Sequence, residues 1–212
     1  MKFHEKAARL AEAAIGRAAQ SRRFIIALAG PPGAGKSRLA AALVDELARR
    51  GQGGAVVPMD GFHLDNAVLK VRGTLARKGA PFTFDADGYA ALLTRLRAEP
   101  DSEIAIPVFD RKLDLARAGG ALVTPDHRFL VAEGNYLLLD GPAWRQMAEL
   151  FDLTVMLRVE LDELRRRLTD RWLEHGLDGE QARERALSND IPNAELVIRK
   201  SLKADLEIIN NA

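Results

Sequence analysis

Short apolar runs rich in Val, Ile and Leu recur along the chain, and longer stretches of helical periodicity separate them. Such a run, bounded by glycine, proline or acidic residues, predicts a strand buried on both faces of a sheet. Because Pro107 cannot donate a hydrogen bond to a neighbouring strand, the run that contains it is expected at a sheet edge. The predicted strands are Phe24–Gly30, Gly54–Asp60, Ile104–Asp110, Phe129–Gly134, Leu153–Val159 and Leu206–Ile209.

The stretches between these runs place apolar residues three and four positions apart, which indicates amphipathic helices. In the helix predicted from Lys36, one stripe consists of Leu39, Leu43 and Leu47, and Gly51 closes the helix. Strands that alternate with helices pair in parallel through right-handed crossovers, so we predict an α/β fold whose mostly parallel sheet lies between two helical layers. Further helices are predicted over residues 1–22, Asp87–Ala98, Pro142–Leu150, Leu161–His175, Gly179–Ser188 and Ala194–Ser201.

Composition narrows the functional classes. With 31 Lys and Arg against 30 Asp and Glu, the net charge of +1 argues against a dedicated nucleic-acid-binding protein. The chain has no cysteine, which excludes disulfides, thiolate nucleophiles and cysteine-ligated metals. No apolar run approaches the ~18 residues of a membrane span, so we expect a cytoplasmic protein without a membrane partner. The 212 residues suit one domain.

The clearest motif is GPPGAGKS, which fits the phosphate-loop pattern G-x-x-x-x-G-K-[ST] between a predicted strand and a predicted helix. Glycines let the backbone approach a polyphosphate closely, and the helix N-terminus adds a positive dipole end. We expect Lys36 to bridge the β- and γ-phosphates and Ser37 to ligate Mg²⁺. The expected nucleotide-binding residues are Gly30, Pro31, Pro32, Gly33, Ala34, Gly35, Lys36, Ser37 and Arg38.

Two predicted strands end in carboxylates, where α/β folds open their ligand crevice. Asp60 could accept the proton of an attacking hydroxyl or hold Mg²⁺ through water, and the alternative is a solvated aspartate in a turn. Glu133 occupies the place of the acidic residue that holds the water shell of Mg²⁺. The expected metal ligands are therefore Ser37, Asp60 and Glu133.

An arginine-rich helix is predicted to form a lid over residues 161–190. Arg167 and Arg171 are four positions apart and share one helix face, so they can neutralise a triphosphate in the transition state. The alternative is a salt-bridged surface helix. Arg171 is the first choice for the functional arginine.

A substrate cap is predicted over residues 61–86, which are irregular and rich in Lys, Arg and Gly. Phe62 and His63 offer an aromatic face and a polar group that suit a hydroxylated substrate. Asn135 and Tyr136 could also reach the substrate, although Tyr136 would equally well pack beneath the crevice.

Six motifs occur together over most of the chain: GPPGAGKS at Gly30–Ser37, MDGFHLDN at Met59–Asn66, RKGAPFTFD at Arg77–Asp85, PVFDR at Pro107–Arg111, VAEGNYLL at Val131–Leu138 and SNDIPNAELV at Ser188–Val197. In these motifs the chain resembles the phosphate-loop small-molecule kinases, which include uridine kinase, bacterial-type pantothenate kinase and phosphoribulokinase. Within the family it looks most like a bacterial subgroup of fructose-transport-associated and nucleoside/nucleotide-kinase-like proteins.

The resemblance implies a five-stranded sheet in the order 2-3-1-4-5, with Asp60 as the base and with Arg167 and Arg171 as the lid arginines. It also implies a substrate site near Asp60, His63, the segment Arg77–Asp85 and Asp110–Arg111. The segment Asn189–Asn193 and the last strand would lie near the adenine. The substrate-binding residues expected from the motifs and from the resemblance are Phe62, His63, Arg77, Asp110, Arg111, Asn135 and Tyr136.

These expectations combine into an ATP- and Mg²⁺-dependent kinase that phosphorylates a hydroxyl of a small metabolite, with a fructose-like sugar preferred through the subgroup. A nucleoside, nucleotide or pantothenate kinase is an alternative, and the basic residues Arg72, Arg77, Lys78 and Arg111 would suit a second phosphate. A nucleotide-dependent switch protein is a further alternative, although no guanine-reading N-K-x-D motif occurs. A homodimer is left open.

Overall fold

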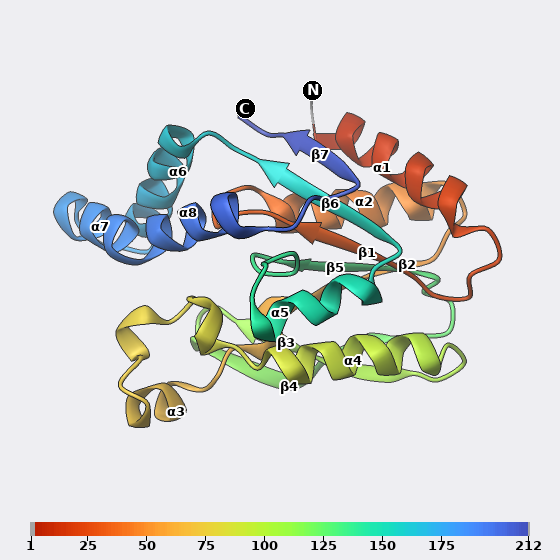
Figure 1. Cartoon of the computed structure of the whole chain (residues 1–212), viewed down its shortest axis with the longest axis horizontal. Helices are drawn as coiled ribbons and strands as arrows, with labels where there is room; N and C mark the ends of the chain where they lie inside the picture. Colours follow the sequence, from red (N-terminus) through yellow and green to blue (C-terminus); the bar gives the residue numbers. More distant parts are fainter. Residues whose placement is uncertain (1–2, 212) are drawn as a thin grey trace.

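Five of the six predicted strands pair side by side in one sheet. The computed structural model describes residues 3–211, and within them five strands form a parallel sheet in the order β2-β5-β1-β6-β7 (Figure 1). Numbered along the chain, this is the predicted order 2-3-1-4-5, so the predicted topology is confirmed. The strands are β1 (Phe24–Ala29), β2 (Gly54–Pro58), β5 (Phe129–Gly134), β6 (Leu153–Arg158) and β7 (Leu206–Ile209).

Both faces of the sheet are covered, as the apolar character of its strands predicts. In β1, Ile26 and Leu28 pack beneath α1 (Phe3–Ala18) and α2 (Lys36–Arg49). The alternate residues Ile25 and Ala27 pack against α4 (Ala86–Ala98), α5 (Pro142–Arg145) and the turn η4 (Gln146–Leu150). One cluster lies on each side of the sheet and joins it to the helices there, so the fold has three layers, α/β/α.

The predicted strand Ile104–Asp110 exists as β3, but it does not join the main sheet. It pairs antiparallel with β4 (Leu115–Val123), a strand that the sequence analysis did not predict. Pro107 lies where the register shifts between Ile106 and Val108, a position that needs no donor. Most of β4 is exposed and contains two adjacent glycines, so its sequence carries little strand signal.

Residues 161–200, between β6 and β7, are mainly helical. They contain α6 (Leu161–Glu174), α7 (Gly179–Arg185), the π-turn η5 (Ala186–Asp190) and α8 (Ile191–Lys200). The sequence predicts a break between Ser188 and Ala194, but the π-turn and α8 span it, with Pro192 in the first turn of α8. We name residues 161–190 the lid segment.

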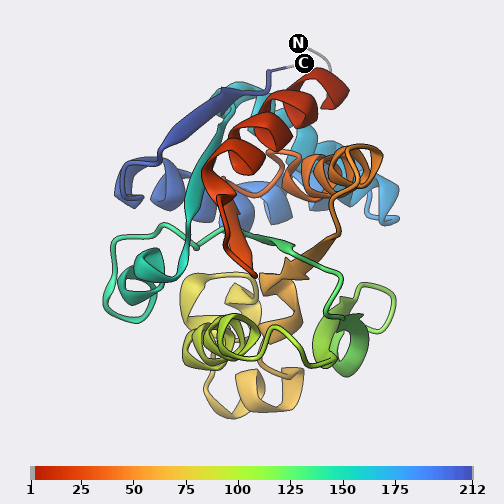
Figure 2. The same cartoon turned by 90° about the vertical axis from the view of Figure 1, so that its right-hand side faces the viewer.

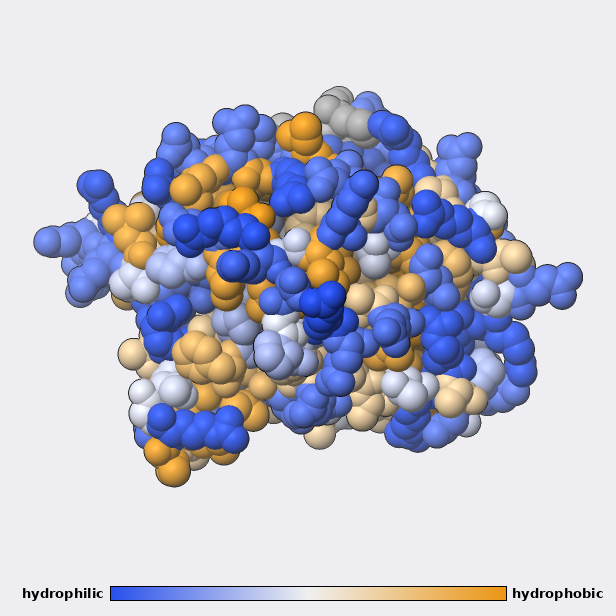
Figure 3. All heavy atoms as spheres, viewed as in Figure 1, coloured by the Kyte–Doolittle hydropathy of each residue, from blue (hydrophilic) through white to orange (hydrophobic). Residues whose placement is uncertain are grey.

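Residues 61–86, which we name the cap segment, contain the short helix α3 (Asn66–Val71) and short 3-10 turns. The cap and lid segments lie at the same end of the molecule, toward which the strand arrowheads point (Figure 1). Apolar side chains, among them Val68 and Val71, are exposed on the outside of α3, where Figure 3 shows an apolar patch. The 3-10 turns are η1 (Met59–Phe62), η2 (Leu75–Arg77) and η3 (Pro81–Thr83).

The start of α1 lies beside the end of β7 (Figure 2). Lys6 donates a hydrogen bond to Asn210 across this contact, with 2.6 Å between Nζ and Oδ1. Within residues 3–211, no helix combines the length and the hydropathy that a bilayer span needs.

Candidate active site

The phosphate-loop motif forms the turn between β1 and α2. Gly33 and Gly35 have φ of 80° and 87°, which lie in the left-handed region that other residues avoid. Gly35 directly precedes the first turn of α2, so the loop ends at a helix N-terminus with its backbone donors free for an anion. The motif therefore has the backbone conformation and the helix position that phosphate binding needs.

Lys36 is buried at the base of this loop. Its ammonium group donates to the carbonyl of Pro31 at 3.0 Å and to Oδ1 of Asn135 at 2.6 Å. Burial lowers the pKa of Lys36, and the nearby carboxylates of Glu133 and Asp60 act in the opposite direction. Asn135, which the sequence predicts as a substrate contact, thus also holds the phosphate-loop lysine.

The register of the parallel strands brings the two strand-end carboxylates to the loop. Glu133 is paired with Leu28 of β1 and with Pro58 of β2, and Asp60 follows two residues after Pro58. Ser37 donates to Oε1 of Glu133 at 2.9 Å. Burial raises the pKa of Glu133, Lys36 lowers it, and Asp60 raises it.

These three oxygen-bearing side chains fit Mg²⁺, which prefers carboxylate and hydroxyl ligands and completes its shell with water and phosphate. A cation beside the buried carboxylate of Glu133 would favour its ionised form. Within residues 3–211, no group of three or more His, Asp or Glu side chains gathers into a metal site, so a bound Mg²⁺ would need further oxygens from a nucleotide.

A cavity of about 790 Å³ opens between the cap and lid segments and reaches the phosphate loop at Pro32. It brings together side chains from five separate parts of the chain, as a site for two substrates would need. The predicted site residues that line it are Pro32, Asp60, His63, Arg111, Asn135 and Arg171.

His63 forms part of an aromatic wall in this cavity. Its ring lies 4.0 Å from the ring of Phe84 and 4.7 Å from that of Phe109, between centroids. Burial lowers the pKa of His63 to about 4, so the ring is neutral near pH 7. Its Nδ1 is buried and has no hydrogen-bond partner within the described chain.

Arg171 is the lid arginine that faces the cavity. Its guanidinium lies 3.1 Å from Oδ2 of Asp190 and stacks over the ring of Trp172 at 5.2 Å. The same carboxylate oxygen accepts a hydrogen bond from Nε1 of Trp172 at 2.6 Å. Asp190 therefore holds Arg171 at the edge of the cavity.

Arg167 has a different place from the one expected. Its guanidinium donates to the carbonyls of Gly33 at 3.3 Å and Asn210 at 2.8 Å, and it pairs with Glu163. These contacts tie the phosphate loop to the last strand, outside the residues that line the cavity. Arg38 does not line the cavity either, and its guanidinium stacks on the ring of Phe3 at 4.5 Å.

Four predicted substrate residues do not line the cavity. Asp110 accepts hydrogen bonds from two backbone N–H groups of the β3–β4 turn and pairs with Arg117. Phe62 packs edge-on against Tyr89. Tyr136 is buried, and its hydroxyl donates a hydrogen bond to the carbonyl of Gly79. Burial raises the pKa of this hydroxyl. Arg77 is the fourth, and its side chain reaches the lid segment.

Lys78, Gly79 and Phe84 line the cavity as well, and they lie in the segment Arg77–Asp85 that the resemblance places at the substrate site. Lys78 donates to Oδ1 of Asn66 at 2.7 Å and lies 2.9 Å from Oδ2 of Asp114. Lys78 and Asn66 lie in the DGFHLDN and RKGAPFTFD motifs, which pointed to this region. Asp114 carried no signal, because the β3–β4 hairpin that positions it was only half predicted. Asn189, Asp190 and Asn193 also line the cavity, and they belong to the segment that the resemblance places near the adenine. The other cavity residues that were not predicted are Leu75, Phe109, Trp172, His175, Leu177 and Arg185.

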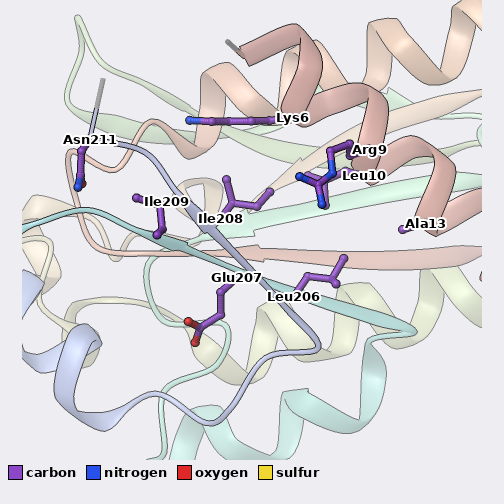
Figure 4. Close-up of a pocket in the computed structure, with 9 residues that line it drawn as sticks. All are labelled: Lys6, Arg9, Leu10, Ala13, Leu206, Glu207, Ile208, Ile209 and Asn211. Atoms are coloured by element: carbon purple, nitrogen blue, oxygen red, sulfur yellow. The ribbon is translucent and has the colours of Figure 1, made fainter. Parts of the chain in front are cut away.

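A second cavity of about 730 Å³ lies between α1 and β7 (Figure 4). Leu10, Leu206 and Ile208 line it together with charged side chains, and none of the predicted site residues is among its lining. The cavity between the cap and lid segments, which contains predicted site residues, is therefore the candidate active site. The fold and the loop motif define the class as phosphate-loop nucleotide-binding proteins.

Comparisons with known proteins identify the family. The chain is 36% identical over 195 residues to a Schizosaccharomyces pombe protein provisionally named uridine kinase, covering 87% of this chain and 82% of that protein. It is 32% identical over 152 residues to the pantothenate kinase of Mycolicibacterium vanbaalenii, covering 71% of this chain and 48% of that enzyme. No family model matches the chain.

A solved structure gives a more complete match. The crystal structure of a Silicibacter protein provisionally called a fructose transport system kinase superposes with a TM-score of 0.91 at 42% identity, covering 98% of this chain and 99% of that one. The chain therefore belongs to the phosphate-loop kinase family of uridine kinase and pantothenate kinase, and it is an ATP-dependent phosphotransferase.

Proposed function

We propose that this kinase transfers the γ-phosphoryl group of ATP to a hydroxyl group of a small sugar of the fructose type. The observation that carries the proposal is the cavity in which Asp60 and the His63 aromatic wall face the mouth of the phosphate loop. The name given to the 42% identical Silicibacter protein supports a sugar acceptor.

The loop and Lys36 hold the phosphates of ATP in this proposal. The free N–H groups at the start of α2 donate to phosphate oxygens, and the Lys36 ammonium exchanges Asn135 for the β- and γ-phosphates. Ser37 and Glu133, with Asp60 through water, are the residues that would hold Mg²⁺. When bound, Mg²⁺ neutralises charge on the phosphate oxygens.

Asp60 orients the acceptor hydroxyl and takes its proton. The hydroxyl oxygen forms a bond to the γ-phosphorus while the bond from this phosphorus to the bridging oxygen of ADP breaks. Arg171 leaves Asp190 and neutralises the charge on the transferring group. The apolar face of the sugar packs on the aromatic wall, and Lys78 and Asn66 offer hydrogen bonds to its hydroxyls.

The substitution Asp60→Asn tests the base. We expect phosphoryl transfer to fall about 10³-fold, because the amide cannot accept the proton, while binding of a non-hydrolysable ATP analogue stays intact. Asp65→Asn is the matched control, since Asp65 only caps α3 and does not line the cavity. Normal transfer by the Asp60→Asn enzyme would exclude Asp60 as the base.

A nucleoside or pantothenate kinase is the second candidate, and the names of the relatives from Schizosaccharomyces pombe and Mycolicibacterium vanbaalenii favour it. A transfer assay with ATP, Mg²⁺ and separate acceptors distinguishes the candidates. Fructose, uridine, pantothenate and nucleoside monophosphates form the panel. Transfer to uridine or pantothenate without transfer to fructose would replace the sugar proposal.

A further inference from the structure

Side chains of the cap segment and of the C-terminal helices hold each other directly. Arg77 of the cap segment donates from Nε to Oδ1 of Asn189 at 2.9 Å, and from Nη2 to Oδ1 of Asn193 at 3.4 Å. In return, Nδ2 of Asn189 donates to the carbonyl of Lys78 at 2.8 Å. A fourth hydrogen bond runs from Arg185 to the carbonyl of Ala76 at 3.1 Å.

The asparagines in this contact are buried, with 2% of Asn189 and 3% of Asn193 exposed. Both polar ends of the Asn189 amide have partners in the cap segment. Because a buried amide that loses its partners is costly, the helices favour the one cap position that satisfies Asn189. We name Arg77, Asn189 and Asn193 the cap–lid bridge.

Asn189 of the bridge directly precedes Asp190, the residue that pairs with Arg171. Asn189 binds the cap segment, and the next residue, Asp190, binds Arg171 and Trp172. Both lie in the π-turn Ala186–Asp190, a helix irregularity that is frequent at functional sites. A shift of this turn therefore changes the positions of the cap segment and of Arg171 together.

We propose that the cap–lid bridge makes the binding of nucleotide and acceptor cooperative, with Arg77 and Asn189 as positioning residues. Phosphates that draw Arg171 away from Asp190 reposition the π-turn, and through Asn189 they order the cap segment for the acceptor. Coupling free energy is reciprocal, so an acceptor held by the cap segment tightens nucleotide binding by the same factor. The inference rests on the nucleotide half of the proposed function.

Hydrogen–deuterium exchange with and without the ATP analogue AMP-PNP and Mg²⁺ tests the bridge. In the wild-type protein, we expect the nucleotide to slow exchange at the phosphate loop and also in residues 66–80. In Arg77→Ala, the slowing at the phosphate loop persists, and the slowing in residues 66–80 falls about tenfold, as the loss of hydrogen bonds to the guanidinium implies. Arg199→Ala, which removes an exposed ion pair of α8, is the matched control and keeps both effects.

The readouts separate the two proposals. Protection of the phosphate loop without protection of residues 66–80 in the wild type would overturn the bridge alone. Equal cap protection in Arg77→Ala and the wild type would also overturn it. Asn189→Ala removes the partner of Arg77, and the slowing in residues 66–80 must fall in this variant too. If Asn189→Ala does not fold, the result for Arg77→Ala decides by itself. No protection of the wild-type phosphate loop would overturn nucleotide binding, and the bridge with it.

Discussion

His63 is a neutral side chain whose burial makes folding sensitive to acid. Burial lowers its pKa from 6.5 to about 4, so the unfolded chain takes up a proton in this pH range that the folded chain does not. The stability that depends on neutral His63 is fully present above pH 6.5 and is lost as the pH falls through about 4. This shift of the His63 pKa corresponds to about 3 kcal/mol of unfolding free energy.

The variant His63→Phe isolates this contribution, because a phenyl ring keeps the stack with Phe84 and Phe109 and cannot take up a proton. We expect the free energy of unfolding of the variant to fall by about 3 kcal/mol less than that of the wild type between pH 7 and pH 4. Urea titrations of both proteins at the two pH values measure the difference. The same acid-induced loss in both proteins would contradict a neutral, buried His63.

Single residues were predictable where the fold fixes their place locally. Asp60 and Glu133 end parallel strands, and the register of adjacent strands brings them to the phosphate loop. Asp114 was missed because its importance comes from a long-range partner, Lys78, that no local pattern reveals. Asp190 lies in the segment that the resemblance places near the adenine, but its pairing with Arg171 was not predicted. The same limit applies to Arg167, whose helical spacing from Arg171 was correct but whose acceptors lie in Gly33 and Asn210.

The helix α6 carries two arginines on one side with different tasks. Arg171 faces the cavity, whereas Arg167 donates to two carbonyls of the phosphate loop and of the chain end. We therefore expect Arg171→Ala to lower kcat about 10³-fold and to cost less stability than Arg167→Ala, because Asp190 keeps the hydrogen bond from Trp172. Arg167→Ala should instead cost about 2 kcal/mol of stability, because two backbone acceptors lose a donor.

Steady-state kinetics with the best acceptor of the panel and urea unfolding of each variant give the two readouts. Each arginine variant serves as the control for the other, since both remove one guanidinium from the same helix. A kcat that falls more in Arg167→Ala than in Arg171→Ala, at equal stability, would reverse the assignment.

At the scale of elements, the sequence was informative where hydrophobic periodicity is strong. The five strands of the parallel sheet are nearly continuous apolar runs, so their number and order were predictable with the family resemblance. The hairpin partner β4 is mostly exposed, and its glycines give it no alternating pattern. The sequence analysis left a gap between the helices that end at Ser188 and begin at Ala194, whereas the π-turn runs directly into α8, with Pro192 in its first turn.

The first helix and the residue after the last strand meet beside the phosphate loop. Asn210, directly after β7, accepts a hydrogen bond from the buried ammonium of Lys6 in α1. Its own amide donates to the carbonyl of Ala34 in the phosphate loop at 2.8 Å. Residues 204 positions apart in the chain thus support one side of the nucleotide loop, and no short-range pattern could have predicted their contact.

This arrangement predicts that Asn210→Ala weakens both the fold and the nucleotide site. The substitution leaves the Lys6 ammonium and the Ala34 carbonyl without their partner, and only 4% of Lys6 is exposed to water. We expect a loss of roughly 2–3 kcal/mol in unfolding free energy and weaker binding of AMP-PNP, because the loop loses one of its supports.

Urea unfolding and calorimetric titration measure these effects. Asn211→Ala is the matched control, since Asn211 is exposed and contacts Glu160 instead. If both variants lose the same stability and bind the analogue equally well, the hydrogen bonds of Asn210 with Lys6 and Ala34 do not support the phosphate loop.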